Sequence, residues 1–152
     1  MNNYQLSQIN VARIKGVNIN DPVMTEFVDN LEKINGLAEN SRGFVWRLKD
    51  DSNSSVYLKV YDDEQVIINI SVWEDIESLE NFVYKTFHTD LLKRRKEWFQ
   101  KFGSAHIAMW WIESGKYPSV EESINRLEYL QKNGASEIVF DFRNKYDCPK
   151  SM

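Results

Sequence analysis

The feature that most constrains the fold is a segment, residues 65–73, that alternates with the period of a strand and is apolar on both faces. One face carries Val66, Ile68, Ile70 and Val72, and the other carries Ile67, Asn69, Ser71 and Trp73. Residues 4–14 also place apolar side chains on both sides. A strand with one face in water alternates strictly between apolar and polar residues. The pattern therefore predicts a sheet that is covered on both faces.

Segments with three- and four-residue apolar spacing lie between these strands and predict helices. Asp21 and Pro22 open the first helix, because Asp can cap free N–H groups and Pro fits the first helical position. A capping box at 119–122 opens the last helix. The expected elements are a strand at 4–14, a helix between 21 and 41, strands at 44–48 and 65–73, a helical stretch at 76–102, a strand at 104–113, a helix at 120–133 and an edge strand at 138–142.

This order is the split βαββαβ plan, so the expected fold is α+β and ferredoxin-like, with an antiparallel sheet and an extra C-terminal helix. Helices would cover one face of the sheet. The other face is too apolar for water, and a second copy of the chain related by a two-fold axis would bury it most simply. We therefore expect a homodimer of the dimeric α+β barrel type. Residues 1–152 form one expected domain, with a flexible tail at 146–152.

Composition excludes several classes of function. A net charge of −4 argues against non-specific nucleic-acid binding, which needs a positive field. No segment approaches the ~18 consecutive apolar residues that indicate a membrane span, so we expect no membrane partner and a cytoplasmic protein. One cysteine, Cys148, rules out a disulfide within the chain, and two histidines argue against a structural zinc site. We expect no bound metal.

Five tryptophans are an unusual number for a domain of this size. Most are expected in the core or at a dimer contact, but an indole N–H also needs a hydrogen-bond partner when it is buried. An aromatic pocket for a small molecule is the alternative reading, with Trp46, Trp73 and Trp110 as its candidates. Asn69 and Ser71 would orient the ligand, because they share the predicted strand face of Trp73.

Three further residues are candidates for chemistry. His88 lies at a break in the helical stretch, where its near-neutral pKa would suit general acid–base catalysis; the alternative is a capping residue or a hydrogen-bonded packing histidine. Arg13 and Arg47 lie in strands among apolar neighbours. Each would bind a carboxylate or phosphate of a ligand, or pair with an acidic residue of a partner subunit.

Several sequence strings are similar to a bacterial family known only as a domain of unknown function. The strings are Val-Trp-Arg at 45–47, Ser-Val-Trp-Glu at 71–74, Phe-Val-Tyr at 82–84 and Arg-Arg-x-Glu-Trp-Phe at 94–99, within a resemblance that runs from about residue 4 to 130. That family resembles the dimeric α+β barrels that include antibiotic-biosynthesis and haem-degrading monooxygenases. The resemblance implies a ferredoxin-like fold with a cavity between sheet and helices, and it adds Tyr84 to the candidate ligand contacts.

The haem-degrading members use an Asn on the first strand, a Trp at the end of the third strand and a His on the following helix. By this resemblance Asn10 and Trp73 match the first two positions, whereas His88 comes later than the family spacing. The resemblance thus implies Asn10 as a catalytic candidate beside His88.

The first functional hypothesis is a small-molecule-binding domain that acts as a cofactor-independent monooxygenase on an apolar or aromatic substrate. Trp46 and Trp73 would stack on the substrate, Asn10 and Asn69 would orient it, and His88 would transfer protons. The alternative is a non-catalytic ligand-binding or dimeric interaction module in which His88 is structural. A weaker alternative is a haem-binding protein.

Overall fold

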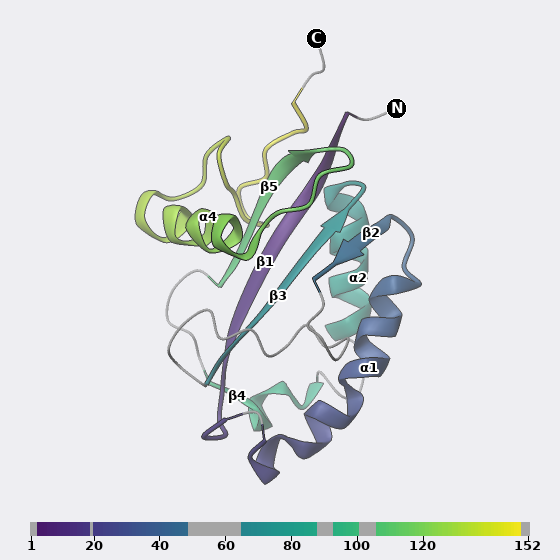
Figure 1. The fold of residues 1–152 in the computed structure, drawn as a ribbon, viewed down its shortest axis with the longest axis vertical. Coiled ribbons are helices and arrows are strands. Elements are labelled where there is room, and N and C mark those ends of the chain that lie inside the picture. Colours follow the sequence, from purple (N-terminus) through teal and green to yellow (C-terminus); the bar gives the residue numbers. More distant parts are fainter. Residues whose placement is uncertain (1–2, 19, 49–64, 88–92, 101–105, 150–152) are drawn as a thin grey trace.

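The computed structural model describes residues 3–18, 20–48, 65–87, 93–100 and 106–149, which form one antiparallel sheet with helices on both of its faces (Figure 1). The strands are β1 (Tyr4–Ile14), β2 (Phe44–Arg47), β3 (Val66–Trp73), β4 (Phe99–Gln100) and β5 (Ile107–Glu113). The α-helices are α1 (Thr25–Glu39), α2 (Ile76–Phe87) and α4 (Val120–Asn133), and short 3-10 helices η1 (Pro22–Met24) and η2 (Arg95–Glu97) precede α1 and β4.

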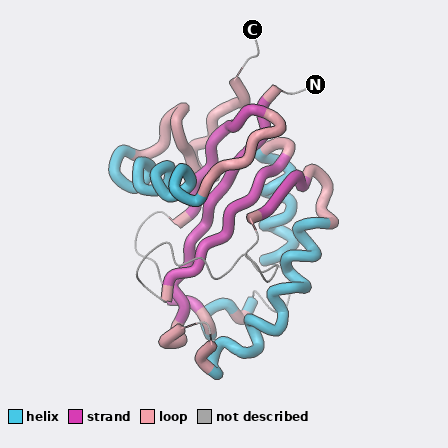
Figure 2. The backbone as a smooth tube through the Cα atoms, viewed as in Figure 1, coloured by secondary structure: helices cyan, strands magenta, loops and turns pink. Residues whose placement is uncertain are grey.

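The strand order confirms the predicted ferredoxin-like plan. β1 pairs with β3 on one side, β3 pairs with β2, and β5 and β4 pair with different parts of the other side of β1. All of these pairs are antiparallel, and α4 is the expected extra C-terminal helix. Figure 2 shows the long central strand with helices on either side of the sheet.

The helical stretch predicted at 76–102 is wrong at Phe99–Gln100, and residues 88–92 and 101–102 of it lie outside the described residues. The helix α2 ends at Phe87, and after the short η2 the chain becomes strand β4, where Phe99 pairs with Ile14. The reason is an aromatic cluster: Phe27 of α1 contacts Trp98 at 5.8 Å and Phe99 at 4.9 Å between ring centroids. Burying these rings against α1 outweighs the local helical spacing of this segment.

A bulge in β2 overturns the predicted alternation of that strand. Phe44 pairs with Trp73, but Trp46 pairs with Val72, and the register shifts between them. Phe44 and Trp46 therefore point to opposite faces of the sheet, whereas strict alternation predicted the same face. The extra residue in the bulge is Val45.

Helix α4 of the same chain covers the part of the second apolar face that β5 and the neighbouring part of β1 form (Figure 1). Ile9, Ala108 and Trp110 on this face pack with Leu127 and Leu130 of α4 in one hydrophobic cluster. The sequence analysis assigned the burial of this face to a second subunit, but where α4 packs on it no second subunit is required. Homodimerisation remains a prediction.

The C-terminal segment contacts the outer edge of β5. Phe140 forms a bridge with Met109, where the predicted edge strand at 138–142 was expected. The Trp111 indole donates to the Tyr146 carbonyl oxygen at 2.8 Å, and Lys145 pairs with Glu80 of α2 at 2.6 Å. Tyr146 thus packs against the domain, although it lies within the predicted flexible tail at 146–152.

An ion-pair cluster at the surface joins η2 to the start of α1. Arg94 donates to Glu26 at 2.8 Å and to Glu97 at 2.6 Å, and these hydrogen bonds lower the pKa of both carboxyls below the ordinary value. A carboxyl whose pKa is lower in the folded state stabilises the fold above its unfolded pKa, and this stability is lost as the pH falls through the folded pKa.

We therefore expect Arg94→Gln to be less stable than the wild type at pH 7, by the small amount typical of exposed pairs. The difference should shrink as the pH falls below about 4.3, the ordinary pKa of Glu. Urea unfolding of both proteins at pH 7 and at pH 3 measures this difference in the free energy of unfolding. Arg143→Gln, at an exposed arginine of the C-terminal segment, is the control. A difference that does not change with pH would contradict this account.

Candidate functional site

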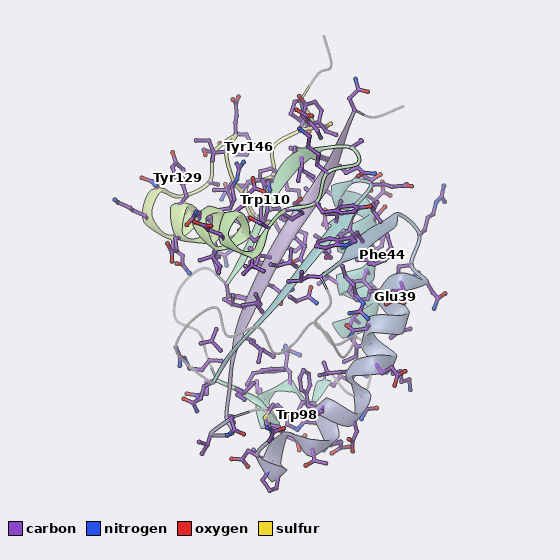
Figure 3. The ribbon with its side chains drawn as sticks, in the orientation of Figure 1. Glu39, Phe44, Trp98, Trp110, Tyr129 and Tyr146 are labelled. Carbon is purple, nitrogen blue, oxygen red and sulfur yellow. The ribbon has the colours of Figure 1, made fainter. Side chains whose placement is uncertain are left out.

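The side of the sheet that faces α1 and α2 carries two hydrophobic clusters, one at each end. The cluster at the start of β1, which we call the upper cluster, contains Leu6, Ala38, Trp73, Leu79, Met109 and Phe140. The lower cluster, at the end of β1, contains Ile14, Met24, Phe27 and Trp98. Figure 3 shows Trp98 near the lower end of the molecule, well below Phe44, which packs against the upper cluster.

Four polar side chains separate these clusters on the same face of β1 and β3. They are Gln8, Asn10, Asn69 and Ser71, which we call the polar belt. Gln8 is opposite Ser71 in the strand register, and Asn10 is opposite Asn69. Gln8 is only 2% exposed and Ser71 is also buried, so the middle of this face is polar beneath the protein surface.

Hydrogen bonds connect the whole belt. The Gln8 amide nitrogen donates to Asn69 Oδ1 at 2.9 Å and to Ser71 Oγ at 2.7 Å. Gln8 Oε1 accepts from Asn10 Nδ2 at 3.2 Å, and the Trp73 indole donates to Ser71 Oγ at 2.8 Å. Buried polar groups are stable only when they are bonded in this way. The network therefore fixes the orientation of both asparagine amides.

Each asparagine keeps one polar atom for another partner. Asn10 Oδ1 and Asn69 Nδ2 form no hydrogen bond with any residue that the structure describes, and both side chains are only half-buried. One atom is an acceptor and the other is a donor, and they come from residues that are directly opposite each other. The belt therefore presents a neutral donor–acceptor pair between two apolar surfaces.

The belt extends to β2 through Arg47, which is opposite Ser71 in the register. The buried guanidinium donates from Nε to Glu39 Oε1 at 2.7 Å, at the last residue of α1. Sequence reasoning left two roles open for Arg47, and the structure pairs it with an acidic residue of its own chain. A cleft of about 480 Å³ lies here, lined by Glu39 and residues 44–48. Figure 3 shows Glu39 and Phe44 at this edge.

Trp73 borders the belt, but its ring is already packed and is not accessible to a ligand at the belt. The Phe44 ring meets Trp73 edge-on at 5.4 Å, the Phe82 ring stacks on it at 5.2 Å, and Trp73 is 1% exposed. Trp73 contacts the belt through its indole N–H. Its predicted stacking on a substrate would require Phe82 to move.

The structure does not bring Trp46 and Trp110 to this site. Trp46 faces the α4 side of the sheet, where its ring stacks on Tyr117 at 4.8 Å, and Trp110 lies in the cluster beneath α4. The prediction that Trp46 and Trp73 enclose one ligand is therefore wrong in its geometry. The bulge in β2 is the physical reason, because it turns Trp46 away from the belt.

The other candidates also lie apart from the belt. Arg13 is opposite Val66 and therefore points to the α4 side of the sheet, at the end of β1. Tyr84 is on the outer side of α2 and is 66% exposed. His88 lies outside the described residues. Ligand contacts by Arg13 and Tyr84, and catalysis by His88 and Asn10, remain predictions.

The family described as "Domain of unknown function (DUF3291)" matches residues 5–152. The chain belongs to this family. No curated protein matches the chain.

Three solved structures are similar to this DUF3291 domain in backbone. Protein SO0527 from Shewanella oneidensis has 10% identity over 73% of this chain and 93% of its own, with a TM-score of 0.46. SnoaB, a cofactor-independent oxygenase from Streptomyces nogalater, has 12% identity over 74% and 94%, with a TM-score of 0.43. PA3566 from Pseudomonas aeruginosa has 12% identity over 74% and 95%, with a TM-score of 0.42.

Two residues of the DUF3291 site were missed by sequence reasoning. Gln8 precedes Asn10 by two residues, so the period of a strand places both on one face, and this signal was available. Glu39 carried no such signal, because only the packing of α1 against β2 brings it to Arg47.

The described parts of the DUF3291 domain hold no group of three His, Cys, Asp or Glu side chains that could bind a metal ion. Within the same residue ranges, no helix has the length and apolar character that crossing a membrane requires.

Proposed function

We propose that this DUF3291 domain binds a neutral, mostly apolar small molecule between its sheet and helices α1 and α2, with the polar belt as the group that orients it. The observation that carries the proposal is the buried, fully connected belt between two hydrophobic clusters. Pockets for small molecules combine apolar walls with a few fixed polar groups in this manner.

The charge state of the belt supports a neutral ligand. The Asn10 and Asn69 amides are uncharged, and the positive charge of Arg47 is matched by Glu39 at 2.7 Å. A ligand carboxylate would have to compete with Glu39 for Arg47. A carbonyl or hydroxyl group would instead match Asn69 Nδ2 and Asn10 Oδ1, which are a donor and an acceptor.

Oxygenation without a cofactor is the reaction that the family resemblance implies for this pocket. In that reaction the bound substrate gives a proton to a base, and the resulting carbanion reacts directly with molecular oxygen. His88 is the candidate base. Asn69, whose Nδ2 is the free donor of the belt, is the candidate partner for the negative oxygen of the substrate, and Asn10 Oδ1 would accept from a hydroxyl of the substrate. An amide donor aimed at a developing charge is a common source of catalysis.

A non-catalytic ligand-binding module is the second candidate, and the composition of the belt favours it. The belt contains amides and one hydroxyl, and in the described residues its acid–base groups are limited to the Arg47–Glu39 pair. A module of this kind would bind the same class of ligand and release it unchanged. The haem alternative is not part of the proposal, because Phe44 and Phe82 enclose Trp73 and leave no open ring for a porphyrin.

We expect Asn69→Ala and Asn10→Ala to weaken ligand binding by up to about tenfold each, since a neutral hydrogen bond contributes about 0.5–1.5 kcal/mol and about 1.4 kcal/mol is a tenfold change in Kd. A thermal-shift screen with neutral phenols, quinones and aromatic ketones finds a ligand first. A ligand at 100 times its Kd stabilises the wild type by about 2.7 kcal/mol. Isothermal titration calorimetry then compares the variants.

Asn125→Ala is the matched control, because it makes the same chemical change at an exposed position of α4. Its Kd should equal that of the wild type. Equal affinity in all four proteins would refute binding at the polar belt. Analysis of the ligand after incubation in air separates the two candidates, because only the oxygenase consumes it.

A further inference from the structure

Three buried polar atoms lie on the opposite side of the sheet, beneath α4, and no described residue satisfies them. They are Gln5 Oε1, Ser7 Oγ and Trp110 Nε1. Ser7 is 0% and Trp110 is 1% exposed. A buried polar group without a partner destabilises a fold, so three such atoms at neighbouring positions indicate a binding site.

The strand register places the three side chains around one point. Ser7 is directly opposite Trp110, and side chains in such a pair have Cβ atoms about 4.5–5.5 Å apart. Gln5 points to the same face two residues earlier on β1, about 7 Å along the strand. One small group can therefore approach all three side chains. Figure 3 shows Trp110 where α4 lies over the sheet.

The other face of the sheet shows what an indole and a serine do when they meet directly. There the Trp73 indole donates to Ser71 Oγ at 2.8 Å, and Trp73 is as buried as Trp110. Trp110 and Ser7 are also neighbours, yet they form no such bond. A third group between them would accept from the Trp110 indole and donate to Gln5 Oε1, while Ser7 can do either.

The charges near this point favour a neutral group. The Arg126 guanidinium lies 5.8 Å from the centre of the Trp110 ring, but its Nη1 donates to the Ile138 carbonyl oxygen at 2.6 Å and its Nη2 lies 3.8 Å from Glu122. Its positive charge is thus directed to groups of α4 and the C-terminal segment. A hydroxyl is neutral and both donates and accepts, so it matches the three atoms.

We propose that Gln5, Ser7 and Trp110 form a binding site for one neutral hydroxyl group, supplied by a buried water molecule or by a small alcohol. Buried waters usually make two to four hydrogen bonds to polar groups of this kind. The site is on the α4 side of the sheet and does not depend on the ligand proposed for the polar belt.

The test is NMR on protein labelled with ¹⁵N at the tryptophan indoles, with the Trp110 signal assigned by its loss in Trp110→Phe. We expect the Trp110 indole proton to show a cross-peak to a long-lived water, or a saturable shift on titration with methanol. The first result identifies water as the source, and the second identifies an alcohol. The Trp73 indole, which already has Ser71 as its acceptor, should show neither and is the internal control.

Ser7→Ala and Gln5→Leu test the other two members of the site. Each should abolish the Trp110 cross-peak or the methanol shift while leaving the Trp73 signal unchanged. Two variants are included so that the test survives if one of them does not fold. A Trp110 indole that shows neither effect in the wild type, or the same effect in both variants, overturns the proposal.

Discussion

Trp73→Ala is expected to lower the free energy of unfolding by about 3–5 kcal/mol, the range for removal of a buried aromatic side chain. Trp73 is in the upper cluster, where it contacts the rings of Phe44 and Phe82. Its loss also removes one of the two donors to Ser71. Urea denaturation followed by circular dichroism measures the change.

Trp73→Phe separates the two contributions. Phe keeps most of the apolar surface but has no indole N–H, so the expected loss is about 1–2 kcal/mol. If Trp73→Ala lowers the free energy of unfolding by less than about 1 kcal/mol, the surrounding residues relax to fill the space of the missing ring. A well-packed core would instead keep a cavity and lose more stability. Trp73 would then be better described as a ligand contact than as part of the core.

The second large effect is expected from Leu127→Ala in α4, which should lower the free energy of unfolding by about 2–5 kcal/mol. Leu127 is 0% exposed and packs with Ile9, Ala108 and Trp110 on the second face of the sheet. If α4 is the cover of this face in solution, a cavity there destabilises the whole domain. Equilibrium denaturation in urea is again the measurement.

Glu128→Ala is the control for Leu127→Ala, because it changes the next residue of α4 at an exposed position. Its effect should stay within about 0.5 kcal/mol, as is usual for surface substitutions. Similar small effects in both variants would mean that α4 does not hold this face. The sheet would then need a second subunit, and sedimentation at micromolar concentration would detect the dimer.

Much of the fold could be predicted from local pattern alone. The period-2 alternation of residues 4–14 and 65–73 located the two central strands and required a cover on each face. The capping box at Ser119 marked the start of α4, and the Ser119 hydroxyl does accept from the Glu122 N–H at 3.0 Å. These signals are readable in sequence because they act between residues that are close along the chain.

The candidate site was predictable only in part. Asn10 and Asn69 were identified as ligand-orienting residues, and the structure places them opposite each other. Trp46 was assigned to the same pocket, and a single bulged residue in β2 moved it to the other face. A shift of one residue moves every following side chain of the strand to the other face of the sheet. A short bulge therefore makes a face assignment wrong even where the alternation of the sequence was read correctly.

The sequence by itself determined the order of the elements and the need to bury both faces of the sheet, because the spacing of apolar residues encodes which surfaces must leave water. The tertiary structure decided what buries them and which polar groups meet. Alternation shows that an apolar face must be buried, but it does not tell whether α4 or a second copy of the chain buries that face. Likewise, only the pairing of β1 with β3 joins Gln8 to Asn69 and Ser71, because register is a property of two strands together.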